Sequence, residues 1–375
     1  MVAGKHARER VGVSAWLMMI VAAVALAVVA AGLVVISRQH NPGAAATPAA
    51  PLPALRVLTM SPAGQDVASG STIAVQFSAD LAQGSPMPVL TPAIPGTWSV
   101  LSPSLLQYQA TGPFVPGITE MLTIPGGPAG VVSVRGQHLA APVSQSFTVA
   151  QGSILRLQQL LAELGYLPLT FTPALPVVSP SQEGNDQVGT FSWRWVNQAS
   201  TLTSLWTPGT DNVITRGAVM NFEAQHNLRA DGSAGPQVWT DLLAAVQSGQ
   251  IDPLPYDYVL VSESLPESAT VFQNGNAMYS TLVNTGVAAA PTERGTWPVY
   301  VRYTVTTMSG RNPDGTSYHD PGIPWVSYFH GGDALHGFVR GSYGFPQSVG
   351  CVEMPISHAS VVYPLTPLGT LVSVV

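Results

Sequence analysis

One thiol and one nearby imidazole are the residues of this chain whose types and spacing could do chemistry. Cys351 is the only cysteine among the 375 residues, it follows Gly350, and His336 lies fifteen positions upstream. A glycine beside a cysteine allows close backbone approach and leaves main-chain N–H groups free to face a substrate oxygen. An imidazole within hydrogen-bond reach can accept the thiol proton or hold the thiolate as an ion pair. The pattern indicates a cysteine nucleophile with a histidine base, against the alternative of an inert buried thiol.

Two neighbouring features bear on metal binding and on substrate access. His330 lies six residues before His336, but the two glycines that follow it predict a turn, so a shared strand face is not assured. No third ligand has suitable spacing, and one cysteine excludes a zinc site with two thiolates, so we expect no metal and no cofactor. Tyr318 lies in the Gly- and Pro-rich stretch 312–324, which we interpret as a flexible lid over a cleft.

The elements that must position these residues are strands. In 295–306, apolar side chains at odd positions alternate with other residues, which predicts one long strand with a buried face. No alternation of strands and helices appears, so a Rossmann-type or hydrolase sheet is disfavoured. Similar short runs predict further strands at 259–261, 269–272, 278–283, 325–329 and 371–375.

Residues 256–375 resemble the catalytic domain of the L,D-transpeptidase (YkuD-type) family. The similarity rests on an ordered set of blocks. These are Gly286 with Pro291-Thr292-x-Arg294-Gly295-Thr296, then Trp325-Val326-x-Tyr328-Phe329 and Ala334-Leu335-His336-Gly337, then Ser348-x-Gly350-Cys351-Val352, and last Pro367-Leu368-Gly369-Thr370-Leu371-Val372.

The resemblance implies a β-sandwich with Cys351 as nucleophile, His336 as base and the carbonyl of Gly337 orienting the imidazole. It implies attack on the carbonyl of the diamino acid at position three of a peptidoglycan stem, with release of D-Ala. The thioester then meets an acceptor amine, giving a 3→3 cross-link, or water. Main-chain N–H groups of Gly350 and Cys351 are the expected oxyanion donors, Ser348 belongs to the same box, and carbapenem-type β-lactams are the expected inhibitors.

Two positions depart from the family pattern. Glu353 stands where Arg or Asn is frequent, and Val349 where His is frequent. Glu353 could oppose a stem carboxylate, contact the amino group of a diamino acid, or make a structural hydrogen bond, and we expect the last. Tyr318, Glu353, His330 and Tyr328 are the expected substrate-binding residues.

Residues 151–250 have helical periodicity. A stripe of leucines after Ser153 predicts a helix that Gly165 stops, and further helices are expected near Thr215 and from Pro236. The segment resembles a peptidoglycan-binding type 1 domain through three blocks: Leu157-Gln158-x-x-Leu161-x-x-Leu164-Gly165-Tyr166, Ile214-Thr215-x-x-Ala218-Val219-x-x-Phe222, and Leu228-x-x-Asp231-Gly232-x-x-Gly235-x-x-Val238-Trp239-x-x-Leu242. The longer stretch 167–210 carries three tryptophans that form either a groove wall or extra core, and we expect core.

The remaining segments suggest an exported, multidomain and mainly β protein. Residues 55–150 show short alternating runs separated by turns, similar to an Ig-like β-sandwich. An apolar run within 14–37 predicts a transmembrane anchor, because about 20 residues cross a bilayer, with a long cleaved signal as the alternative. Basic residues in 1–13 place that end in the cytoplasm, and 38–54 is an Ala/Pro linker.

Composition limits the class of partner. The chain has 14 Lys and Arg against 20 Asp and Glu, so no basic excess is available to neutralise phosphates and we expect no nucleic-acid partner. We expect a cell-membrane protein with its catalytic domain outside the cytoplasm, acting on peptidoglycan stem peptides and glycan. Two alternatives stay open: a non-catalytic wall-binding scaffold, and a purely hydrolytic L,D-carboxypeptidase or cysteine peptidase.

Overall fold

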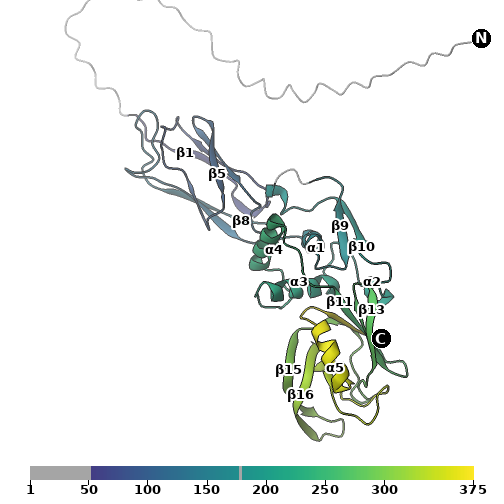
Figure 1. Ribbon diagram of the computed structural model, residues 1–375. Helices are drawn as coiled ribbons and strands as arrows, with labels where there is room; N and C mark the ends of the chain where they lie inside the picture. The colour runs from purple at the N-terminus through teal and green to yellow at the C-terminus, as the bar shows by residue number, and fades with distance from the viewer. Residues whose placement is uncertain (1–51, 177–179) are drawn as a thin grey trace, which may run out of the picture. The chain divides into compact units, whose positions relative to one another are not determined.

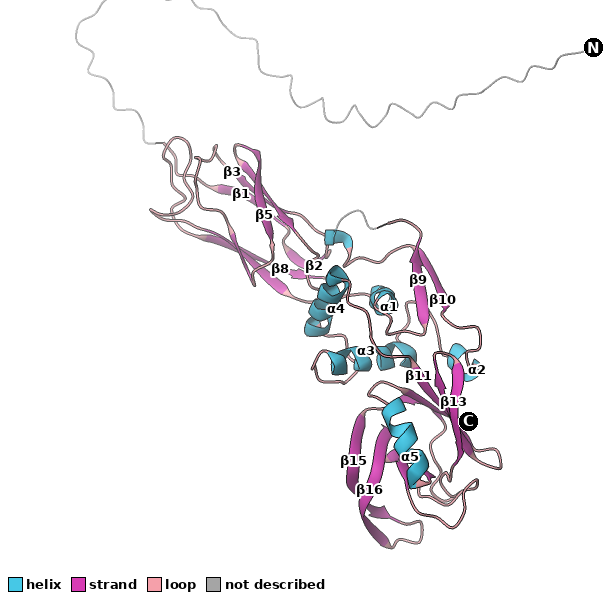
Figure 2. Cartoon of the chain, in the orientation of Figure 1, coloured by secondary structure: helices cyan, strands magenta, loops and turns pink. Residues whose placement is uncertain are grey.

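The computed structural model describes residues 52–176 and 180–375, and strands dominate it (Figures 1 and 2). The segments 1–13 and 14–37 and most of the linker 38–54 lie outside the described residues, so the anchor stays a prediction. Within the described ranges, no helix has the length and apolar character needed to cross a membrane. The mainly β, multidomain class is confirmed.

The first domain consists of two four-stranded sheets that share one core. Alternate side chains of β3 (Ile73, Val75 and Phe77) are buried in it, as the period-2 pattern predicts. Residues 131–134 belong to the alternating runs expected as strands in 55–150, but they form only isolated bridges. The likeness to an Ig-like domain stays a prediction. In pairing order, the strands are β1 (Val57–Ser61), β3 (Ile73–Phe77), β6 (Leu105–Ala110) and β5 (Gly96–Ser102), then β2 (Gly64–Val67), β8 (Val143–Val149), β7 (Thr119–Ile124) and β4 (Val89–Thr91).

The second segment has the helices that the periodicity predicts. Helix α1 (Ile154–Glu163) is capped by Ser153, whose side chain accepts from the N–H of Arg156, and α4 (Pro236–Ser248) begins at its proline. Helix α3 (Val213–Gln225) lies between them in the chain.

The long middle stretch of this segment differs from a plain helical bundle. It contains an antiparallel hairpin of β9 (Leu169–Pro173) and β10 (Gly189–Trp193), the 3-10 turn η1 (Pro180–Gln182) and the short helix α2 (Ser200–Thr203). Trp193 and Trp206 pack against the core of the helices and also line a cavity of about 690 Å³, so each has features of both the core and the groove-wall interpretation. The hairpin was not predicted, because its pairing joins residues that are distant in sequence.

The C-terminal domain has two sheets and one helix on a common core. The five-stranded sheet has the order β13 (Asn276–Leu282), β12 (Ser268–Gln273), β11 (Asp257–Ser262), β19 (Leu371–Val374) and β14 (Gly295–Pro298). The four-stranded sheet has the order β15 (Val301–Arg311), β16 (Ser317–His330), β17 (Asp333–Gly337) and β18 (Val352–Met354). Helix α5 (Ile356–Val362) contacts β16 and β17, and the 3-10 turn η2 (Tyr363–Leu365) follows it.

The single long strand predicted over 295–306 is wrong. The chain crosses there from one sheet to the other, because the N–H of Val299 donates to the carbonyl of Thr370 whereas that of Tyr300 donates to Tyr328. β14 and β15 therefore belong to different sheets. The predicted buried face fails past the crossing, since Tyr303 and Val305 are 45% and 59% exposed.

The expected lid over 312–324 is also wrong in part. Only the tip around 312–316 is a turn, and β16 begins at Ser317 and pairs with β15 along its length. The register shifts between Thr306 and Met308, opposite the Pro321-Gly322 step. A bulge is a position where a strand tolerates proline, so the proline content did not exclude a strand.

The helical segment and the C-terminal domain share packed residues. The core around α1, α3 and α4 includes Tyr258 of β11 and Leu371 of β19. The hydroxyl groups of Thr201 and Tyr258 are 2.6 Å apart. A Cβ on Gly217 of α3 would lie 2.6 Å from the carbonyl oxygen of Gly369, so this contact depends on the absence of a side chain.

Candidate active site

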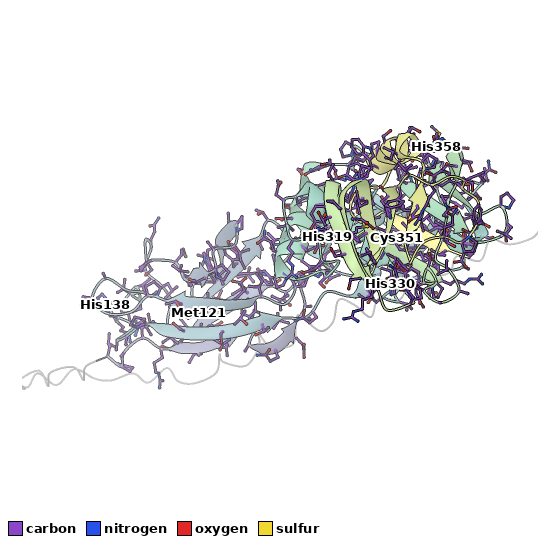
Figure 3. All side chains as sticks on the ribbon, turned by 90° about the horizontal axis from the view of Figure 1, so that it is seen from below. Met121, His138, His319, His330, Cys351 and His358 are labelled. Carbon is purple, nitrogen blue, oxygen red and sulfur yellow. The ribbon has the colours of Figure 1, made fainter. Side chains whose placement is uncertain are left out.

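Parallel pairing of β17 with β18 brings the histidine and the cysteine to one site. In this register His336 is opposite Glu353, and Cys351 immediately precedes β18. Both His336 and Cys351 line a cavity of about 320 Å³. Figure 3 shows Cys351 in the C-terminal domain, with His330 and His358 on different sides of it. The fourteen residues between the two groups thus connect β17 to β18 and return the nucleophile to the base.

His336 is 3% exposed, and the arrangement of its ring fits a general base. Its Nδ1 lies 3.1 Å from the carbonyl oxygen of Gly337, the contact expected from the sequence. A carbonyl can only accept, so Nδ1 carries the proton and Nε2 has a free lone pair. Desolvation lowers the pKa of His336, and the hydrogen bond to Gly337 opposes this only in part. The imidazole is therefore neutral at neutral pH, which is the form that can accept a proton.

Cys351 is partly exposed and lines the cavity. Burial raises the pKa of Cys351, a backbone hydrogen bond from Ala334 opposes the rise, and the charges of Asp333 and Glu353 add to it, with a net pKa of about 12. The sulfur also lies 3.7 Å from the carbonyl oxygen of Gly332. These pKa shifts favour a neutral thiol beside a neutral imidazole in the resting site over the thiolate ion pair.

The turn before the nucleophile is held by a buried serine. The hydroxyl of Ser348 donates to the carbonyl oxygen of Cys351 and accepts from the N–H of Gly350 at 3.2 Å. Gly350 has φ +118, and a Cβ there would lie 2.4 Å from the Oδ1 of Asp333. The N–H of Gly350 donates to Ser348, which favours the N–H of Cys351 as the oxyanion donor. The expected oxyanion roles of both N–H groups stay predictions.

A charged pair on the cavity wall explains the unusual acid of the cysteine box. Glu353 accepts from Nε and Nη2 of Arg340 at 2.7 and 2.8 Å, and the guanidinium lies over the ring of Phe338. Both carboxylate oxygens of Glu353 are engaged, which agrees with a structural role and leaves little for a substrate. Arg340 was missed from the sequence, although a buried acid of this kind always needs a partner.

The other expected substrate-binding residues divide into two groups. Tyr318 lines the cavity from β16. Tyr328 does not line this cavity, but Tyr328 and Cys351 pack against the same small cluster of buried side chains, so its expected role stays a prediction. His330 does not line the cavity either, and its role also stays a prediction. His330 instead contacts the ring of Trp297, with centroids 4.5 Å apart, and its Nδ1 lies 3.8 Å from Asp333. Over the described ranges, no cluster of His, Cys, Asp and Glu could hold a metal ion.

Comparison with known proteins identifies this domain. The family model of the YkuD L,D-transpeptidase catalytic domain matches residues 256–374. This part of the chain belongs to that family and is an enzyme domain of the L,D-transpeptidase class. No curated protein matches the chain.

Solved structures of the same class are similar to the chain at low identity. An L,D-transpeptidase from Mycobacterium smegmatis is 11% identical with a TM-score of 0.30, covering 86% of this chain and 100% of that one. The catalytic domain of an Enterococcus faecium L,D-transpeptidase is 23% identical with a TM-score of 0.30, covering 33% and 100%. L,D-transpeptidase 3 from Mycobacterium tuberculosis, with a faropenem-derived adduct, is 13% identical with a TM-score of 0.29, covering 85% and 97%. The assignment of residues 256–374 to the YkuD family rests on the family model, because TM-scores of about 0.3 do not support it.

Proposed function

We propose that this chain is an exported peptidoglycan L,D-transpeptidase with Cys351 as nucleophile and His336 as base. The observation that carries the proposal is that the two side chains line one cavity while the Nε2 lone pair of His336 is free. The family match to 256–374 supports the reaction class.

The first half-reaction forms a thioester and releases D-Ala. The thiol proton of Cys351 moves to Nε2 of His336 as sulfur attacks the carbonyl carbon of the diamino acid at stem position three. The oxyanion that forms is stabilised by the N–H of Cys351. The C–N bond then breaks, and the proton on His336 goes to the departing amine of D-Ala. Because both groups are neutral at rest, proton transfer accompanies attack and does not precede it.

The second half-reaction regenerates the thiol. The acceptor ammonium of a neighbouring stem first gives one proton to solvent. The neutral amine then attacks the thioester carbonyl, the C–S bond breaks, and His336 carries a second amine proton to the sulfur, which gives a 3→3 cross-link. Water in place of the amine gives net L,D-carboxypeptidase activity. A thioester intermediate replaces one difficult step with two easier ones.

Mass spectrometry with a carbapenem tests the nucleophile. The wild-type protein is expected to gain the mass of one carbapenem, and Cys351→Ala is expected to gain none. A wild-type protein that gains no mass would favour a non-catalytic wall-binding scaffold. Muropeptide donors with and without an acceptor amine then separate transfer from hydrolysis, because a pure hydrolase yields no dimers.

Export and wall binding are further parts of the proposal. The apolar run at 14–37 and the basic residues before it support a membrane anchor with the catalytic domain outside the cytoplasm. Fractionation tests this, since the full chain should sediment with membranes and a chain lacking 1–51 should not. The resemblance of 151–250 to a peptidoglycan-binding domain supports wall binding, which co-sedimentation with purified peptidoglycan measures.

A further inference from the structure

The charged residues of the catalytic cavity do not balance. Three charged side chains line it: Asp320, Arg340 and Glu353. Arg340 and Glu353 neutralise each other through two hydrogen bonds. Across 52–176 and 180–375, no ion pair and no side-chain hydrogen bond engages the carboxylate of Asp320. The cavity therefore holds one uncompensated negative charge, and it belongs to Asp320.

The position of Asp320 is fixed by the sheet. It lies on β16 opposite Met308 of β15, two residues after Tyr318. Residues two apart on a strand face the same side, and both Asp320 and Tyr318 line the cavity. The charge of Asp320 is close enough to oppose the lowering of the pKa of His336 and to contribute to the raised pKa values of Tyr318 and Arg340. An unpaired carboxylate thus lies within electrostatic range of the reacting groups.

We propose that Asp320 is a specificity-determining residue that binds an ammonium group of the substrate. The inference rests on the proposed function, because an L,D-transpeptidase substrate brings two amines to the site. One is the side-chain amine of the donor's diamino acid, and the other is the amine of the acceptor. An aliphatic amine of this kind has a pKa of about 10.4 and is an ammonium ion at neutral pH. A free carboxylate beside the cavity complements that charge, whereas Glu353 is already paired with Arg340.

The test uses Asp320→Asn, which keeps the shape of the side chain and removes its charge. Glu163→Gln is the matched control, because it removes one exposed negative charge from α1, which does not line the cavity. Release of D-Ala is measured from a tetrapeptide donor with a free side-chain amine and from the same donor with that amine acetylated. Transfer to an amine acceptor is measured separately over a range of acceptor concentrations.

Loss of a charged contact predicts an effect of about tenfold. If Asp320 binds the donor, Asp320→Asn raises KM about tenfold for the free-amine donor and leaves the acetylated donor unchanged. If it binds the acceptor, the variant leaves D-Ala release unchanged and raises the acceptor KM by a similar factor. Equal values for Asp320→Asn and Glu163→Gln in both arms overturn the inference. A wild-type protein that releases no D-Ala from either donor overturns instead the proposed function on which the inference rests.

Discussion

At the scale of single residues, the burial of Cys351 beside His336 favours the protonated form of its thiol. Desolvation raises the pKa of Cys351 to about 12, and desolvation lowers that of His336. Each shift removes a charge from the resting cavity. We therefore expect proton transfer from Cys351 to accompany attack on the substrate rather than to precede substrate binding.

Alkylation of Cys351 by iodoacetamide measures this state directly. Only the thiolate reacts, so below the pKa the rate should rise about tenfold for each pH unit, with no plateau before pH 10. Intact mass reports one site, since the chain has one cysteine, and Cys351→Ser gives the background. A plateau reached below about pH 8.5 would show a thiolate stabilised by His336, and the neutral resting state would be wrong.

The two single substitutions of the Arg340–Glu353 pair should lower the free energy of unfolding by unequal amounts. The side chain of Glu353 is 6% exposed and that of Arg340 is 30% exposed. Arg340→Met strands a buried carboxylate and should cost about 3 kcal/mol, whereas Glu353→Gln strands a cation that water can reach and should cost about 1 kcal/mol.

Urea unfolding of both single variants and the double variant measures the coupling between the two side chains. The double variant should lose less free energy of unfolding than Arg340→Met alone, since no charge then stays buried and unpaired. Additive losses would mean that the two side chains do not stabilise each other.

At the scale of elements, the turn from Ser348 to Cys351 depends on one glycine and one hydroxyl. Gly350→Ala forces a side chain at φ +118 against Asp333, so we expect a loss of about 1–3 kcal/mol and a slower carbapenem acylation. Ser348→Ala leaves the N–H of Gly350 and the carbonyl of Cys351 without their partner, with an expected loss of about 1–3 kcal/mol.

Thermal unfolding and acylation rates of these variants check the turn. Gly341→Ala is the matched control, because nothing lies within 4 Å of a Cβ built there and its φ is not in the left-handed range. A Gly350→Ala protein as stable and as reactive as this control would contradict the strain that the turn implies.

Local signals were enough to predict the elements that depend on neighbours in sequence. Ser153 and Pro236 start helices because a capping hydroxyl and a fixed φ act within one turn. Cys351 and His336 were expected from their residue types and from the resemblance of their short sequence blocks to the L,D-transpeptidase family. The turn from Ser348 to Cys351 is local, but the approach of the two side chains depends on the pairing of β17 with β18.

Features that depend on distant pairing were not predicted. The alternation in 295–306 reveals period 2 but not the sheet to which each half belongs, so the crossing at Val299 was missed. Arg340 was missed because its pairing with Glu353 requires the return of β18 to the site. Asp320 was hidden in a stretch interpreted as a loop, although it is part of β16.

At the scale of the whole molecule, the helical segment and the catalytic domain share a core, so they should unfold together. Tyr258 and Leu371 of the catalytic sheet belong to the core of the helices, and α3 contacts both β14 and β19. A shared core couples the stability of the elements on either side of it, and this coupling can be tested at the close contact between Gly217 and Gly369.

Gly217→Ala sets two effects against each other at that contact. Alanine is a better helix former than glycine, which favours the variant by about 1 kcal/mol. The added Cβ would lie 2.6 Å from the backbone oxygen of Gly369 and 2.8 Å from Leu371, and such overpacking costs about 1–3 kcal/mol. Because a backbone oxygen cannot rotate away, we expect the steric clash to outweigh the gain in helix propensity and Tm to fall.

Hydrogen exchange should then be faster in both α3 and β19 of the Gly217→Ala variant. The control Gly235→Ala, whose added Cβ meets open space, should change the exchange of neither element. Faster exchange confined to α3 would mean that the two segments unfold independently.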